Sequence, residues 1–348
     1  MMFMWYENLT SIPEGLLPAT TLANNCYEAM FANCKNLTSI PEGLLPATTL
    51  ANNCYEGMFE NCENLTSIPG GLLPATTLAP YCYSHMFDSC HNLTSIPELP
   101  ATTLAPYCYS HMFDTCNNLT SISAGLLPAT TLANNCYEGM FSSCYNLTSI
   151  PELPATTLAP YCYSHMFSSC YNLTSIPELP ATTLANNCYE YMFSSWLNLT
   201  SISEGLLPVT TLAPYCYSHM FSSCEKLTSI PEGLLPATTL ANNCYEGMFD
   251  SCENLTSIPE GLLPATTLAP YCYSHMFDSC MLKNISRYLL PARTLANNCY
   301  EYMFANNYYI TYAPGLPAKN LADDCYKRMF QFCNNLASVV FSGETIGL

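Results

Sequence analysis

The chain has 348 residues, of which 49% are hydrophobic and only 10% are charged, and its formal net charge is −18. This apolar content supplies a continuous core and excludes an intrinsically disordered chain. The strong acidity repels phosphate backbones, so nucleic acid is not expected as a partner, and no run approaches the roughly 18 apolar residues that a membrane span needs.

The chain starts with an apolar segment, Met1–Tyr6, that runs directly into Asn8-Leu9-Thr10. The segment lacks the basic flank of a signal peptide. Its pattern is that of the second half of a repeat, so we expect the regular region to begin in mid-repeat.

One motif, Cys-Tyr-x-x-Met-Phe, recurs twelve times with a period of 26 to 28 residues, and most copies are followed by a run close to Asn-Leu-Thr-Ser-Ile-Pro. Its first cysteines are Cys26, Cys54, Cys82, Cys108, Cys136, Cys162, Cys188, Cys216, Cys244, Cys272, Cys299 and Cys325. A period of this length indicates that each copy is one supersecondary unit, which buries its apolar side only by stacking on its neighbours. The pattern predicts one elongated solenoid rather than two or three globular domains.

Each repeat is expected to contain three elements. Cys26, Met30 and Cys34 follow at intervals of four residues, which predicts a short amphipathic helix. The segment 36–41 is β-branched and closed by a proline, which predicts one short strand of a parallel sheet per repeat. The return segment 45–50 is expected to be extended, because a residue before proline is pushed toward β or polyproline geometry. The predicted fold class is therefore an α/β solenoid.

The end of the chain differs from its middle. Residues 1–280 contain two cations against 22 acidic residues, whereas residues 281–348 contain six cations against four acidic residues, and their repeats are degenerate. We therefore predict a regular repeat region over 1–280 and a terminal cap over 281–348, since open solenoids need polar caps.

The residues Phe31, Cys34, Leu37 and Ile40 form a Phe-x-x-Cys-x-x-Leu-x-x-Ile core. This core resembles that of the BspA-like leucine-rich repeat surface proteins, and the likeness covers nearly the whole chain. The Met-Phe dyad and the Leu-Pro-Ala-Thr-Thr-Leu return are variants of the usual pattern. The resemblance implies a curved leucine-rich-repeat stack, an extracellular or cell-surface location in a bacterium or protozoan, and a role in adhesion.

The 22 cysteines are expected to be reduced core thiols. On a helix, Cys26 and Cys34 would lie about 12 Å apart, which is too far for a disulfide. The second cysteine of the motif is replaced by Trp196 in one repeat and by Asn307 in another, while Cys188 and Cys299 remain. The tryptophan suggests that this position occupies an apolar pocket.

Histidines and sequons are read as structural. Five histidines follow a tyrosine by four residues and are expected to share a helix face with it: His85, His111, His165, His219 and His275. No His/Cys cluster has the spacing of a zinc site, so neither a metal nor another cofactor is expected. Asn-Leu-Thr occurs nine times as a formal glycosylation acceptor, but sugars on adjacent strands would collide. We expect instead a ladder of asparagines that satisfies backbone groups at the turn into each strand.

An acidic column accompanies the prolines, formed by Glu14, Glu42, Glu98, Glu152, Glu178, Glu232 and Glu260, together with Glu204. We expect a solvated edge, with calcium binding as the alternative, because oxygen ligands suit that ion.

One position of the repeat changes its chemistry from copy to copy. The residue after the second cysteine position, which Trp196 occupies in one repeat, is in order Lys35, Glu63, His91, Asn117, Tyr145, Tyr171, Leu197, Glu225, Glu253 and Met281. We call this set the variable stripe and expect it to be exposed along one edge. It is either a tolerant turn position or a ligand-binding stripe.

The sequence favours a noncatalytic binding scaffold that recognises a protein or polysaccharide, and no enzyme motif is present. The alternative is a self-assembling structural protein that forms fibres or a surface layer by end-to-end association, because a repetitive surface suits a repetitive partner.

Overall fold

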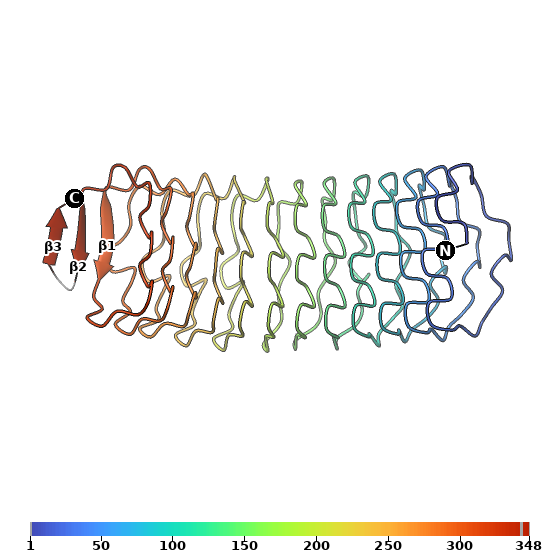
Figure 1. The fold of residues 1–348 in the computed structure, drawn as a ribbon, viewed down its shortest axis with the longest axis horizontal. Helices are drawn as coiled ribbons and strands as arrows, with labels where there is room; N and C mark the ends of the chain where they lie inside the picture. Colours follow the sequence, from blue (N-terminus) through green and yellow to red (C-terminus); the bar gives the residue numbers. More distant parts are fainter. Residues whose placement is uncertain (1, 342–343, 348) are drawn as a thin grey trace. The chain divides into compact units, whose positions relative to one another are not determined.

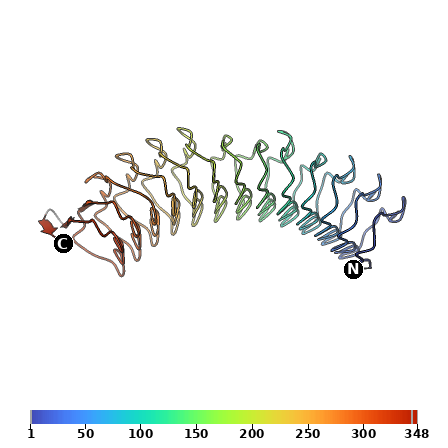
Figure 2. The same cartoon turned by 90° about the horizontal axis from the view of Figure 1, so that it is seen from above.

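The computed structural model describes residues 2–341 and 344–347. The chain divides into two compact units, Met1–Leu173 and Thr174–Leu348. Within each unit every repeat forms one coil, and successive coils lie side by side (Figures 1 and 2). The predicted change at residue 280 concerns the repeat pattern and stays a prediction.

The predicted helix is wrong, because none of the described residues is helical. The segment 24–34 is instead a row of successive turns, which we call the turn row. Every fourth residue of the row has a positive φ, as at Asn25 (58°), Ala29 (47°) and Asn33 (61°). A right-handed helix excludes such angles. Cys26 and Met30 therefore share a face because the turns repeat every four residues.

The turn row is held by two alternating sets of backbone hydrogen bonds. The N–H groups of Tyr27 and Phe31 donate to the carbonyl oxygens of Cys54 and Met58 in the next coil, at 3.0 and 2.9 Å. Between them, the N–H of Met30 donates to the carbonyl of Tyr27 in its own turn, at 3.2 Å. An isolated nine-residue helix would leave four N–H and four C=O groups without intrahelical partners. The ladder between coils pairs these groups, which compensates for the strained φ angles.

Among the described residues, strands longer than a single bridge begin at Tyr312, and they cover only the later part of the predicted segment. In the last two repeats the segments that begin at the position of Ser39 become β1 (Tyr312–Leu316) and β2 (Ser338–Phe341), which pair in parallel, as at Tyr312 and Ser338. A third strand, β3 (Glu344–Gly347), pairs antiparallel with β2 (Figure 1). In earlier coils the same extended segment makes isolated parallel bridges, such as Ser67 with Ser95.

The return segments are extended, as expected, and also meet in single bridges. Thr21 bridges Thr49, and Thr77 bridges Thr103. Short extended stretches interrupted by proline cannot build a longer ladder, because proline lacks the N–H donor.

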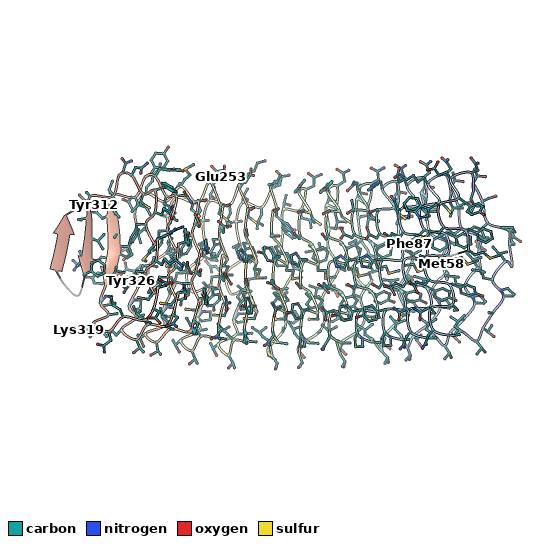
Figure 3. The ribbon with its side chains drawn as sticks, viewed as in Figure 1. Met58, Phe87, Glu253, Tyr312, Lys319 and Tyr326 are labelled. Atoms are coloured by element: carbon teal, nitrogen blue, oxygen red, sulfur yellow. The ribbon has the colours of Figure 1, made fainter. Side chains whose placement is uncertain are left out.

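The core consists of columns that repeat the same side chain from coil to coil. Phe31 stacks on Phe59 with ring centroids 5.5 Å apart, and Tyr55 stacks on Tyr83 at 6.0 Å. The Met-Phe positions are buried, as at Met58 (Figure 3), except that Phe330 in the last copy is half-buried. Each buried Met or Phe side chain contributes about 1.5–3 kcal/mol of hydrophobic stabilisation.

All 22 cysteines are thiols, and all except Cys26 are buried. The second thiol of a repeat donates to the carbonyl of a phenylalanine in the preceding coil, as from Cys116 to Phe87 at 3.3 Å. Burial raises the pKa of the Cys116 thiol well above its ordinary value. The expectation of reduced core thiols is confirmed, although the helical geometry first used to support it does not apply.

Candidate recognition surface

The variable stripe lies where each turn row meets the extended segment, directly after the buried second cysteine. Figure 3 places Glu253 at this edge of its coil. Glu225 and Glu253 are exposed, while the other eight members of the stripe are half-buried. The stripe is therefore accessible, but its side chains lie against the coils and are less exposed than expected.

Successive members of the stripe interact in pairs across neighbouring coils. The ammonium of Lys35 lies 2.8 Å from the Glu63 carboxylate, and this hydrogen bond raises the lysine pKa. The rings of Tyr145 and Tyr171 stack with centroids 4.7 Å apart and planes 11° from parallel. The backbone sets this register, since the N–H of Asn64 donates to the carbonyl of Lys35 at 3.2 Å.

The pair His91 and Asn117 is polar. The His91 Nδ1 lies 3.0 Å from the carbonyl oxygen of Thr115 and 3.5 Å from the Asn117 Nδ2. The Asn117 Oδ1 is buried without a hydrogen-bond partner among the described residues. The stripe thus combines an ion pair, a polar pair and an aromatic pair within the first unit.

A row of asparagine amides runs beside the stripe, and the expected asparagine ladder is confirmed. The Nδ2 of Asn64 donates to the Oδ1 of Asn36 at 3.2 Å, and Asn118 donates to Asn92 at 3.0 Å. The ladder runs mainly from amide to amide, whereas backbone acceptors had been expected. Where Lys226 takes the asparagine position, its ammonium donates to the Asn198 Oδ1 at 2.7 Å.

The histidines lie on the turn rows, and the helix that was expected to place each of them beside the tyrosine four residues earlier is absent from the described residues. His85 Nδ1 lies 2.9 Å from the Asp88 carboxylate, and the His85 ring stacks on His111 at 4.9 Å. Tyr81, four residues before His85, stacks instead on Tyr107 at 4.5 Å. The hydrogen bond to Asp88 raises the His85 pKa. The spacing of Asp88 three residues after His85 was the signal in the sequence that could have identified this pair.

The acidic column lies apart from these groups, and all eight of its glutamates are exposed. Among the described residues, no group of three or more His, Cys, Asp or Glu side chains is placed to hold a metal ion. The expected solvated edge therefore fits the exposure of the column. Within the described part of the chain there is also no helix of the length and apolarity that a membrane crossing requires.

Comparison with known proteins identifies the repeat. The sequence profile of the BspA type leucine rich repeat region, in six copies, matches residues 3–139, 81–228 and 137–280. A search among curated proteins found no significant match.

Two solved structures are similar to the chain. The crystal structure of a leucine-rich repeat protein from Bacteroides ovatus has a TM-score of 0.52 and 17% identity, over 96% of this chain and 81% of that chain. A leucine rich cell surface protein from Faecalibacterium prausnitzii has a TM-score of 0.40 and 19% identity, over 96% of this chain and 88% of that chain.

The first of these likenesses establishes a leucine-rich-repeat fold. The profile matches extend over residues 3–280, well over half of the sequence. The chain therefore belongs to the BspA-type leucine-rich repeat family.

Proposed function

We propose that the protein is a noncatalytic scaffold at a cell surface, which recognises a protein or polysaccharide through its variable stripe. The observation that carries this proposal is the stacked pair Tyr145 and Tyr171, half-buried at the accessible edge. Aromatic side chains are enriched in binding hot spots, because they bury a large area at low conformational cost.

The contrast between fixed and variable positions supports the same function. Core positions such as Met140 and Phe141 are fully buried, and the Met-Phe pair repeats in all twelve copies of the motif. The stripe alone combines acidic, basic, aromatic and aliphatic residues. Core packing already explains why the fixed columns keep the same residue. Selectivity for a ligand would therefore come from the variable stripe, where the side chain differs from coil to coil.

The test is a double substitution, Tyr145→Ala with Tyr171→Ala, examined on glycan and host-protein arrays. We expect loss of the strongest binding signal with a melting temperature close to that of the unmodified chain. Tyr271→Ala is the matched control, because Tyr271 is 38% exposed on a turn row outside the stripe. Unchanged binding by the double variant, or equal loss in the control, would contradict the proposal.

A second function, self-assembly, is favoured by a different observation. In earlier coils, backbone donors such as the N–H of Tyr300 reach the next coil, here the Cys325 carbonyl at 3.0 Å. The equivalent N–H groups of Tyr326, Arg328 and Phe330 have no backbone acceptor among the described residues. Backbone donors without an acceptor among the described residues can pair with another strand, from this chain or from a second copy. Light scattering and electron microscopy of concentrated protein test this function, and a strict monomer would exclude it.

A further inference from the structure

A cavity of about 350 Å³ opens in the second unit, where the repeat pattern degenerates. Two arginines and a tyrosine, Arg287, Arg293 and Tyr288, form part of its lining. The apolar lining includes Leu290, Leu316 and Val340. Cationic side chains above an apolar floor are unusual in a chain with a net charge of −18.

Comparison with the preceding repeat shows which substitutions build this cavity. The bridges of Ser257 with Asn284 and of Thr267 with Thr294 set a register of 27 residues. In that register the three lining residues, Arg287, Tyr288 and Arg293, take the places of Glu260, Gly261 and Thr266. In this coil the charge at the acidic-column position is thus reversed from negative to positive, and an aromatic ring replaces the glycine beside it.

The equivalent loops elsewhere in the second unit form a cavity of opposite charge. That cavity has a volume of about 380 Å³ and is lined by Glu178 and Glu204. Both cavities lie on the same loops of the repeat, so the loop geometry alone does not account for the arginines. The same loops of the repeat therefore present carboxylates at one cavity and guanidinium groups at the other.

The basic cavity is held in shape by a close backbone contact. The N–H of Gly315 donates to the carbonyl of Arg287 at 3.0 Å. A Cβ at position 315 would lie 3.0 Å from the same oxygen, so glycine allows the approach. The Arg287 guanidinium then lies over the Tyr288 ring, 5.1 Å from its centroid. Neither cavity arginine forms an ion pair with any carboxylate whose side chain the structure describes.

We propose that this cavity binds the C-terminal carboxylate of a peptide whose last side chain is aliphatic. The guanidinium fork of Arg287 or Arg293 matches a carboxylate, which it binds through two parallel hydrogen bonds. The aliphatic side chain lies on Leu290, Leu316 and Val340. An acidic sugar fits this floor less well, because its hydroxyl groups would be buried against apolar side chains without partners. This site is separate from the variable stripe and does not depend on it.

The probe is a fluorescent hexapeptide that ends in Val-Leu with a free carboxylate, and its control is the same peptide as the C-terminal amide. Titration by fluorescence anisotropy with the full chain is expected to show at least about tenfold tighter binding of the acid, as charge-assisted hydrogen bonds to a carboxylate require. Equal binding of acid and amide, or no binding of either at millimolar peptide, would overturn the proposal. This comparison uses the unmodified chain and does not depend on the folding of a variant.

Two variants locate the site by restoring the residues of the preceding repeat, Arg287→Glu and Arg293→Thr. Each is expected to weaken binding of the acid about tenfold or more, because a charged partner is removed. Lys283→Thr is the matched control, since it also removes a cation and restores Thr256 of that repeat but lies outside the cavity lining. If Lys283→Thr weakened binding of the acid equally, the binding would depend only on the overall charge of the chain, and the proposed site would be overturned. Binding of an oligogalacturonate at this cavity without the peptide would replace the peptide with an acidic glycan and likewise overturn the proposal.

Discussion

Asn307 donates a hydrogen bond from its Nδ2 to the carbonyl oxygen of Phe277, at 2.7 Å. In the neighbouring repeats the carbonyl of the equivalent phenylalanine accepts a hydrogen bond from a cysteine thiol. Cys280 donates to Phe249 at 3.2 Å, and Cys333 donates to Phe304 at 3.1 Å. The second cysteine position therefore supplies a hydrogen-bond donor to the coil before it. The apolar pocket inferred from the sequence describes only part of this role.

The first prediction concerns this donor. Asn307→Leu keeps the approximate volume but leaves the buried Phe277 carbonyl and the Leu282 N–H without their Asn307 partners. We expect a loss of about 2–4 kcal/mol in the free energy of unfolding, measured by urea denaturation, because each unsatisfied group costs about 1–3 kcal/mol. Asn307→Cys restores the thiol of the other repeats and should lose less. If the leucine variant were as stable as the cysteine variant, the donor role would be wrong.

The second prediction concerns the buried tyrosine column. The hydroxyl of Tyr109 is buried and has no hydrogen-bond partner among the described residues. Tyr109→Phe removes a desolvated polar group without opening a cavity. We therefore expect the free energy of unfolding, measured by urea denaturation, to rise by about 1 kcal/mol. Tyr161→Phe serves as control, since Tyr161 is 39% exposed and should change stability little. A clear loss of stability in Tyr109→Phe would show that its hydroxyl is satisfied in solution.

The third prediction tests the packing of the turn rows. Gly139 has a φ of +58°, and a Cβ there would lie 2.4 Å from the His111 ring. Gly139→Ala should therefore destabilise the protein by about 1–3 kcal/mol, from left-handed backbone strain together with displacement of the imidazole. The double variant with His111→Ala should recover the part due to the ring. Strict additivity in this double-mutant cycle would show that the two positions do not contact each other.

The fourth prediction concerns pH. The hydrogen bond from His275 to Asp278 raises the histidine pKa above its ordinary 6.5. The folded state therefore favours the charged imidazole, which stabilises it below pH 6.5, and this stabilisation is lost as pH rises through the folded pKa. His275 should therefore make the urea midpoint of unfolding fall between pH 5.5 and pH 8. In the variant His275→Gln this fall should be smaller.

The matched comparison is His165, whose pKa is lowered by burial. Folding then favours the neutral ring, so this histidine costs stability at low pH. His165→Gln should steepen the same fall in midpoint between pH 5.5 and pH 8. If both variants shifted the profile in the same direction, the opposite protonation states assigned to the two histidines would be incorrect.

Much of the repeat could be predicted from its residues. The period, the buried Cys, Tyr, Met and Phe columns and the asparagine ladder all follow from chemistry repeated at fixed intervals. The backbone of the turn row did not follow, because an interval of four residues suits both a helix and a row of four-residue turns. One signal was available: Asn53, Gly57 and Asn61 place residues that tolerate positive φ at every fourth position.

The sequence by itself determined which side chains face the core and which position varies most widely, since both depend on the order of residues within one repeat. The tertiary structure decided how the backbone closes and which variable residues meet. The carbonyl of Met58 accepts the Phe31 N–H only when two coils lie side by side, and the same stacking brings Tyr145 onto Tyr171. These partners are 26 or 27 residues apart in the chain, so no local preference could reveal them.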